Sequence, residues 1–477
     1  MASDTVAIPE EHGIERHGIE RVSPATRTHV RIFDNFTMWL SANLVISTVA
    51  LGTLPSAPFL NMGFWDSFAA IILFNALGVL PVAFFSTLGP KLGLRQMTIS
   101  RFSFGWVGAI IMALFNVAAC IGWSAVNVIV GAQLVTALSG GAFPLWASIL
   151  VIAVLTTIVS IYGYRYVHGY ERFAWIPMII MFAIIFVMAA PHFTALATQN
   201  TGLTEVAAFI TFGGAVYGFA TGWSSYAADY NVNQPEETPA RRVFWLTFLG
   251  VFIPCVVLET LGLGLITTLK SVPAWGTAFD KGSVGGLLTA IVSPLGGFGT
   301  LILILLALSV VANNIPNDYS LGLSIQVFGR TFQRVPRYVW TLIGAVIYVI
   351  IAIIGGSNFS STLESFLLVI AYWLGPWAII LILEHFVFRH GRYNVEDWNT
   401  PERLPIGWAA IVSLAIGLVG VYLGASQSLF TGPIAKALNF TDIGFELGVV
   451  FAGISYLILR RIEINRSPRG EVGVGGK

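Results

Sequence analysis

The sequence predicts an all-α polytopic membrane protein, because the chain carries little charge and contains long apolar runs. Of its 477 residues, 56% are hydrophobic and 10% are charged, and the mean hydropathy is +0.79. Soluble proteins carry about 25% charged residues, so this composition excludes a cytosolic enzyme. The apolar runs are continuous and do not alternate with polar residues, which excludes an outer-membrane β-barrel.

Twelve apolar segments are long enough to cross a membrane, since one helical crossing needs about 20 residues. The predicted spans are residues 34–57, 65–88, 104–138, 145–163, 172–190, 205–228, 243–268, 296–328, 338–355, 362–387, 406–425 and 443–460. The third and eighth spans exceed one crossing, so we expect them to be tilted or to extend beyond the bilayer.

The positions of Lys and Arg predict the orientation of the chain. With the N-terminus in the cytoplasm, 22 of the 25 Lys and Arg residues fall in cytoplasmic segments. Only Lys270, Lys281 and Lys436 fall outside. Cytoplasmic loops are enriched in Lys and Arg. We therefore expect a multi-pass protein of the cytoplasmic (plasma) membrane with both termini inside, and a short helix within the outer loop 269–295.

The spans predict an internal repeat, because a break in spans one and six would place equivalent helices five spans apart. We expect a cytoplasmic N-terminal tail at 1–33, five-helix repeats at 34–190 and 205–387, two peripheral helices at 406–460 and a cytoplasmic tail at 461–477. The first tail contains the tandem repeat HGIERHGIER, whose role stays open, and both tails are expected to be mobile.

Several classes of function are excluded by what the sequence lacks. The net charge of +1 gives no electrostatic attraction to nucleic acid. Cys120 and Cys255 lie inside apolar runs, which suggests neither a disulfide framework nor a metal site. The sequence contains no zinc-hydrolase, serine-hydrolase or P-loop motif. We expect a protein that is not an enzyme, without a catalytic residue, a cofactor or an obligate protein partner.

The third span places polar residues on one helical face. Asn116, Trp123 and Asn127 are spaced by 7 and then 4 residues, and Cys120 and Gly131 extend the same stripe. An amide in the middle of a membrane must find a hydrogen-bond partner. Asn127 therefore either joins two helices or contacts a ligand beside the indole.

The sixth span is rich in glycine and contains the second tryptophan. Gly213, Gly214, Gly218 and Gly222 each weaken a helix by about 1 kcal/mol relative to alanine, and Trp223 follows directly. The glycines either allow close helix packing or mark a discontinuous helix that lines a site, as in secondary transporters.

The eighth span contains three amides within five residues. Asn313 and Asn317 follow Ser309 at helical spacing, Asn314 and Asp318 flank them, and Pro316 is expected to kink the helix. The first span adds Ser41 and Asn43. Packing alone explains this cluster poorly, because intramembrane polar residues usually serve a function.

Two tryptophans and several neutral amides suit a small, flat, uncharged heterocycle as substrate. Indole faces stack on a ring, and amides both donate and accept hydrogen bonds along its edge. An ion channel is the rival class, but a symmetric filter or a charged ring is not visible. A membrane-embedded enzyme is poorly supported.

Four segments resemble the nucleobase–cation symporter-1 family, and most closely its fungal-type purine–cytosine permeases. They are GIERVSPATRT at 18–28, NFTMWLSANLVIS at 35–47, GWSAVN at 122–127 and ANNIPNDYSLGLS at 312–324. The resemblance implies a LeuT-like fold of twelve helices with broken helices one and six, and cation-coupled symport of nucleobases such as cytosine, adenine, hypoxanthine or guanine. Hydantoin, allantoin or uracil are alternative substrates.

The resemblance also implies a substrate site and a coupling-cation site. The residues that match the family's base site are Trp123, Asn127, Trp223, Asn313 and Asn314, and we add Ser41. The sodium site of the family maps to Ser41, Leu44, Ser309, Ala312 and Asn313, but the adjacent Ser/Thr pair of sodium-coupled relatives is missing here. We therefore slightly favour H⁺ over Na⁺ as the coupling ion. Glu259, within span seven, is a weak candidate for the proton carrier, with hydrogen bonding to a neighbouring helix as its alternative.

The first testable prediction concerns topology. Because the Lys and Arg residues divide so unevenly, reporter fusions within residues 270–290 should read as external, and fusions at either terminus as cytoplasmic. A cytoplasmic signal from the 270–290 loop would overturn this orientation.

Overall fold

The computed structural model describes residues 18–27, 31–57, 60–161, 164–356, 359–427, 430–467 and 469. Within these ranges the chain forms helices and their connections, apart from one isolated bridge between Ser426 and Thr431. Helices are the expected solution, because a helix satisfies its own backbone hydrogen bonds in lipid. The all-α prediction is therefore confirmed.

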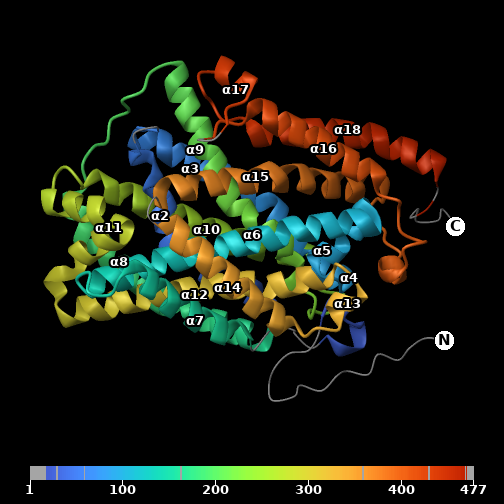
Figure 1. The fold of residues 1–477 in the computed structure, drawn as a ribbon, viewed down its shortest axis with the longest axis horizontal. Helices are drawn as coiled ribbons and strands as arrows, with labels where there is room; N and C mark the ends of the chain where they lie inside the picture. Colours follow the sequence, from blue (N-terminus) through green and yellow to red (C-terminus); the bar gives the residue numbers. More distant parts are fainter. Residues whose placement is uncertain are drawn as a thin grey trace.

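Each of the twelve predicted spans coincides with helical structure (Figure 1). In chain order the spans contain α1 (Asp34–Asn43) with α2 (Ile46–Gly52), α3 (Phe64–Ser86), α6 (Arg101–Leu138), α7 (Leu145–Ile161), α8 (Tyr164–Ala189), α9 (Leu203–Thr221) with η4 (Gly222–Tyr230), α10 (Ala240–Thr267), α12 (Gly297–Gln326), α14 (Arg337–Gly355), α15 (Phe359–Leu383), α16 (Trp408–Gly424) and α18 (Gly444–Arg466).

The described residues contain eight helices that are long and apolar enough to cross a membrane, or nine if the bent pair α1–α2 is one span. The other predicted spans fall on the shorter apolar helices α7 and α16 and on α18. The number of twelve crossings is consistent with these helices and stays a prediction.

The helices pack in two groups with the last two at the side. In one group α6 contacts α7, α12 and α14, and in the other α3 contacts α9 and α10, while α1 and α2 pack on α10. Helices α16 and α18 pack on each other and against α15, at one edge of the molecule (Figure 1).

The first span is broken although it has no central glycine or proline. Helix α1 ends at Asn43, Val45 is extended, and α2 starts at Ile46 with a bend of 60°. Side chains replace the lost helical bonds at the break. Asn313 Nδ2 donates to the Ala42 carbonyl at 2.6 Å, and Ile46 N–H donates to Ser309 Oγ at 3.4 Å.

The sixth span changes from α-helix to a 3₁₀ segment at Gly222, with non-helical backbone at Tyr226. Only the last of its four glycines lies at the break. Gly213, Gly214 and Gly218 lie inside regular α9, and a Cβ on Gly218 would sit 2.0 Å from the Leu367 carbonyl oxygen. The close-packing alternative is therefore correct for Gly218, and the discontinuous-helix prediction is correct for Gly222.

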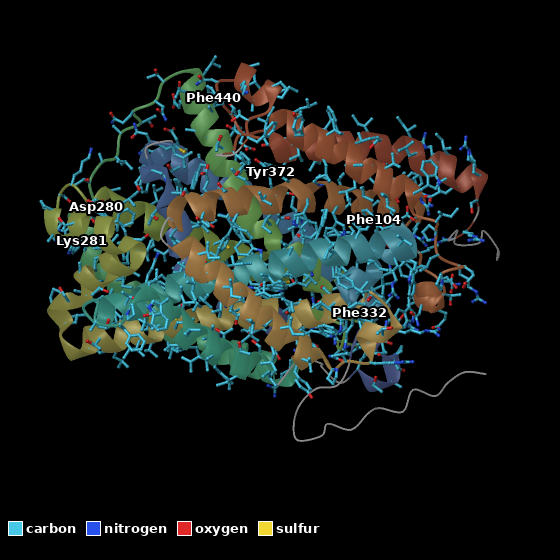
Figure 2. All side chains as sticks on the ribbon, viewed as in Figure 1. Phe104, Asp280, Lys281, Phe332, Tyr372 and Phe440 are labelled. Atoms are coloured by element: carbon cyan, nitrogen blue, oxygen red, sulfur yellow. The ribbon has the colours of Figure 1, made fainter. Side chains whose placement is uncertain are left out.

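The outer-loop prediction and the tail prediction have different outcomes. Residues Pro273–Val292 form α11, which confirms a helix in the loop 269–295, and it bends at Ser283 (φ 51°). Figure 2 shows Asp280 and Lys281 at the left end of the long axis and Phe332 in the right half of the view.

The expectation of a mobile N-terminal tail is wrong for residues 18–27, although most of the HGIER repeat lies outside the described residues.

Residues 18–27 pack against the connections around Gly93 and Glu396. Val22 N–H donates to the Gly93 carbonyl at 2.9 Å, and Arg21 Nη1 donates to Glu396 Oε1 at 2.6 Å. Ile19 is buried. These contacts use backbone and side-chain partners that are 70 or more positions away, which apolar periodicity does not reveal.

The second testable prediction concerns the contact between α2 and α10. A Cβ on Gly262 would lie 2.1 Å from the Val49 carbonyl oxygen, and backbone cannot move aside cheaply. Gly262→Ala should lower the free energy of unfolding by about 1–3 kcal/mol. Gly297→Ala is the matched control, because no atom lies within 4 Å of its Cβ position. Thermal unfolding of the purified proteins measures both, and an unchanged melting temperature for Gly262→Ala would contradict this account of the packing.

Candidate functional site

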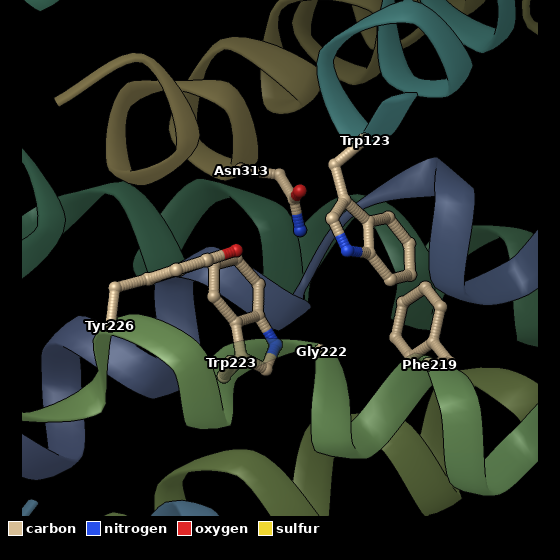
Figure 3. A pocket seen from close by; sticks show the side chains of 6 residues that line it. All are labelled: Trp123, Phe219, Gly222, Trp223, Tyr226 and Asn313. Carbon is tan, nitrogen blue, oxygen red and sulfur yellow. The ribbon is translucent and has the colours of Figure 1, made fainter. Parts of the chain in front are cut away.

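A small enclosed pocket lies where the broken sixth span meets α6 and α12 (Figure 3). Its cavity volume is about 10 Å³, so the lining side chains nearly close the pocket in this structure. The lining residues are Trp123, Phe219, Gly222, Trp223, Tyr226 and Asn313. Apolar walls with a few convergent polar groups are typical of small-molecule sites. The pocket is therefore the candidate binding site.

Perpendicular aromatic contacts hold both tryptophans in place. The Trp123 ring lies edge-on to Phe219 at 5.5 Å and to Phe366 at 5.0 Å between ring centroids. Trp223 makes the same kind of contact with Trp39 at 5.3 Å and with Tyr226 at 5.7 Å. Edge-to-face pairs are favourable for aromatic rings. Each indole is thus fixed by its neighbours before a ligand arrives.

Gly222 is required at the break because of Trp123. A Cβ at this position would lie 2.7 Å from Cζ2 of the Trp123 ring. The backbone of the broken span therefore reaches the indole directly, which brings α9 and η4 close to α6. A larger residue would push the two walls of the pocket apart.

Asn127 joins α6 to α12 through both of its amide hydrogens. Its Nδ2 donates to Asn313 Oδ1 at 2.6 Å and to Asn314 Oδ1 at 2.8 Å. Asn314 Nδ2 in turn donates to the Ser124 carbonyl at 3.4 Å. Buried amides must be satisfied in this way, because an unpartnered polar group in an apolar environment costs several kcal/mol. We call Asn127, Asn313 and Asn314 the amide network.

The amide network also holds the broken first span. Ser47 Oγ of α2 donates to Asn127 Oδ1 at 2.6 Å, and Asn313 Nδ2 donates to the Ala42 carbonyl of α1. At the end of α1, Trp223 Nε1 donates to Asn43 Oδ1 at 3.0 Å. The two broken spans are thus tied to each other and to α6 and α12 at the pocket.

The structure brings together the residues predicted for the substrate site, but it divides them into two layers. Trp123, Trp223 and Asn313 line the pocket. Asn127 and Asn314 lie behind this lining, within the amide network. Ser41 is buried in α1 and is absent from the pocket lining. Direct contact of Asn127 with a substrate stays a prediction.

Four residues near the pocket were not predicted as site residues: Phe219, Tyr226, Asn317 and Ser47. Tyr226 Oη donates to Asn317 Oδ1 at 2.6 Å, so the break of the sixth span is joined directly to α12. The signal for Asn317 was present, because it belongs to the amide cluster of span eight. Nothing in the sequence distinguishes Phe219, Tyr226 or Ser47 from other apolar or hydroxyl residues of these spans.

The residues proposed for a coupling cation lie around the break in the first span. Ser309 Oγ accepts from Ile46 N–H and donates to the Leu306 carbonyl at 2.7 Å. The Ala42 carbonyl accepts from Asn313. Leu44 lies at the break and Ser41 one turn before it, in α1, while the side chain of Ala312 lies outside the described part of the chain. Two oxygens near this position therefore already have N–H donors.

One donor in the pocket has no partner among the described residues. The Nε1–H of Trp123 is buried and makes no hydrogen bond. It faces the space between Asn313 and Trp223 (Figure 3). Indole N–H groups usually find an acceptor when they are buried. A ligand with a carbonyl or ring-nitrogen acceptor would supply one.

Comparison with known proteins identifies the family of the chain. Residues 22–448 match the family described as a permease for cytosine/purines, uracil, thiamine, allantoin. The chain is 44% identical to a purine-cytosine permease of Emericella nidulans, over 95% of this chain and 90% of the relative. It is 39% identical to a purine-cytosine permease of Saccharomyces cerevisiae, over 94% of this chain and 87% of the relative.

A solved structure shows the same fold at low sequence identity. This is Mhp1, a nucleobase-cation-symport-1 family transporter in a closed conformation with bromovinylhydantoin bound. The TM-score is 0.73 at 17% identity, over 94% of this chain and 96% of that chain. The expected LeuT-like fold is therefore confirmed. The permease family and the permeases among the relatives show that the protein is a membrane transporter and not an enzyme. The chain belongs to the permease family for cytosine, purines, uracil, thiamine and allantoin, within its purine–cytosine branch.

Proposed function

We propose that the protein is a secondary active transporter that takes up purine and pyrimidine nucleobases together with a cation across the plasma membrane. Cytosine, adenine, hypoxanthine and guanine are the expected substrates. The observation that carries this proposal is the unpartnered Trp123 Nε1–H in a pocket walled by two indoles and an amide. Purine-cytosine permeases that cover nearly the whole chain support it.

The pocket chemistry suits a neutral base. The Trp123 and Trp223 rings offer aromatic faces, and base–aromatic stacking contributes about 1–3 kcal/mol per base. Trp123 Nε1–H donates to a ring acceptor, and the amide of Asn313 and the hydroxyl of Tyr226 lie across the pocket (Figure 3). Lys and Arg are absent from the pocket lining. A charged substrate would therefore lack a counter-ion here.

Alternating access follows from the two broken spans. Helices α9 and α10 pack on α3, and α1 and α2 pack on α10, whereas α6, α7, α12 and α14 form the other group. The pocket lies between these groups, so a rocking movement of one against the other would expose it to each side in turn. From the distribution of Lys and Arg, we expect both termini to face the cytoplasm.

We propose H⁺ as the coupling ion in preference to Na⁺. The Ala42 carbonyl and the Ser309 hydroxyl oxygen already accept hydrogen bonds from N–H groups. A sodium ion needs these or similar oxygens as ligands. The amide nitrogen of Asn313 thus donates to the carbonyl oxygen at the helix break that a sodium ion would otherwise bind.

The third testable prediction concerns this coupling ion. In proteoliposomes, an inwardly directed proton gradient should increase uptake of radiolabelled cytosine several-fold, and a sodium gradient alone should have no effect. A proton uncoupler should abolish the accumulation. Uptake that requires sodium and ignores the uncoupler would refute proton coupling and leave nucleobase transport intact.

The fourth testable prediction concerns the binding residues. Asn127→Ala and Trp123→Ala should each weaken cytosine binding by about 1–3 kcal/mol, which is roughly 5- to 150-fold. Trp123→Phe should keep part of the affinity, because an aromatic face remains. Asn127→Asp keeps the shape and loses the amide donor, so it should alter which bases compete.

The measurement is direct binding to purified, folded variants. Trp123→Phe removes the indole N–H and keeps an aromatic ring in the same wall of the pocket. It also removes part of a buried ring, so the melting temperature should fall as well, and affinity is measured on the folded protein. A packing role alone predicts lower stability with unchanged affinity. If folded Asn127→Ala and Trp123→Ala bind cytosine, hypoxanthine and adenine like the wild type, the site lies elsewhere.

A further inference from the structure

Asp318 is a buried carboxyl group in α12 with one unused oxygen. The residue is 1% exposed. Its Oδ1 accepts from Ser124 Oγ of α6 at 3.1 Å, and its Oδ2 has no hydrogen-bond partner among the described residues. An anionic carboxylate inside a membrane protein is costly unless it is paired. A proton on this oxygen therefore removes the cost of an unpaired buried charge.

Asp318 is directly connected to the amide network. Its partner Ser124 follows Trp123 in the chain, and the Ser124 carbonyl accepts from Asn314 Nδ2. Asn314 Oδ1 then accepts from Asn127, and Asn317, the neighbour of Asp318, accepts from the pocket residue Tyr226. Four hydrogen bonds thus lead from Asp318 through Ser124, Asn314 and Asn127 to the pocket residue Asn313.

The groups that face Asp318 do not neutralise it by direct pairing. Arg337 and Tyr348 face it from α14, and Cys120 faces it from α6. The Arg337 side chain donates to the carbonyls of Ser160 and Ile161 at 3.4 and 3.1 Å, and it covers the Tyr319 ring at 4.6 Å. No ion pair within the described ranges joins Arg337 to Asp318.

Two other buried carboxyl groups, Glu384 and Asp229, have partners on both of their oxygens. Glu384 is held by Arg389 at 2.8 Å and by Arg460 at 2.9 Å. Both Asp229 oxygens accept hydrogen bonds, from Gln96 N–H at 2.7 Å and from Ser320 Oγ at 3.0 Å. Glu259 Oε1 is unpartnered, but Glu259 Oε2 accepts from Asn75 of α3, away from α6 and α12.

We propose that Asp318 carries the coupling proton. This inference rests on the proposed function and names the group that takes part in coupling at the same site. On the outer side a hydronium ion gives its proton to the Asp318 carboxylate and becomes water. On the cytoplasmic side a water molecule takes the proton back and leaves the carboxylate. Substrate binding and protonation each favour the other, as linkage requires.

Binding tests the proton link first. Because one proton is bound with the substrate, the wild-type dissociation constant for cytosine should rise by up to about tenfold per pH unit on the alkaline side of the Asp318 titration. Asp318→Asn mimics the neutral acid, so its affinity should stay close to the acid-pH wild-type value and lose the pH dependence. Glu259→Gln is the matched control and should keep the wild-type pH profile.

Transport in proteoliposomes tests coupling itself. With a pH-sensitive dye inside the vesicles, cytosine entry into wild-type vesicles should acidify the lumen. Asp318→Asn should retain cytosine exchange, lose accumulation driven by the proton gradient and give no acidification. If Asp318→Asn is unstable, Asp318→Glu keeps a titratable group and should retain coupling with a shifted pH profile.

The outcomes separate the two proposals. If the wild type binds no nucleobase at any pH, the proposed function fails. If the wild type binds and transports cytosine but Asp318→Asn keeps the pH dependence and proton flux, Asp318 is not the carrier. Wild-type coupling to sodium without proton movement also overturns the inference. Loss of both properties in Glu259→Gln instead of Asp318→Asn assigns the proton to α10.

Discussion

The hydrogen bonds of the Asn127 side chain are the interaction on which the rest of the site depends. This one amide uses both hydrogens on α12 and its oxygen on α2. It sets the orientation of Asn313, whose own nitrogen then holds the carbonyl of Ala42 at the end of α1. In a membrane interior no water can replace a lost hydrogen bond, so the orientation of each amide depends on the bond that its neighbour makes. The break in the first span, the α6–α12 contact and one wall of the pocket are thus set together.

Neutral amides and fixed charges have different roles in this molecule. Away from the pocket, Glu384 is held by Arg389 and Arg460, and Tyr456 donates to it at 2.8 Å, which attaches α18 to the end of α15. Breaking such a buried pair is strongly destabilising, so it suits a permanent contact. The pocket is instead built from amides, hydroxyls and indoles. These groups can exchange partners at moderate cost, as a site that binds and releases a substrate requires.

The sequence was sufficient to predict the helices and several of the residues that meet at the pocket, and the reasons are physical. Apolar runs of membrane length have few alternatives to a helix, and Trp123, Asn127 and Asn313 are conspicuous because polar groups are costly in lipid. The break at Leu44 could not be read from composition, because the Ala42 carbonyl and the Ile46 N–H beside it are satisfied by side chains from α12, far along the chain. The same limit applies to Tyr226, which is important only through its contact with Asn317.

The packing of residues 18–27 shows a related limit. A polar, charged segment is expected to be mobile when it is considered alone, yet Arg21 finds Glu396 and Val22 pairs with Gly93. Local pattern therefore predicts whether a segment can enter the membrane, and tertiary contacts decide whether a polar segment is held at its surface.

The most direct test of this account is an experimental structure of the protein with cytosine bound. The base should lie between the Trp123 and Trp223 rings, with one of its acceptors at hydrogen-bond distance from Trp123 Nε1, and with Asn313 or Asn127 on its polar edge. A base bound outside the pocket between α6, η4 and α12, or a Trp123 Nε1 that remains without an acceptor in the complex, would contradict it.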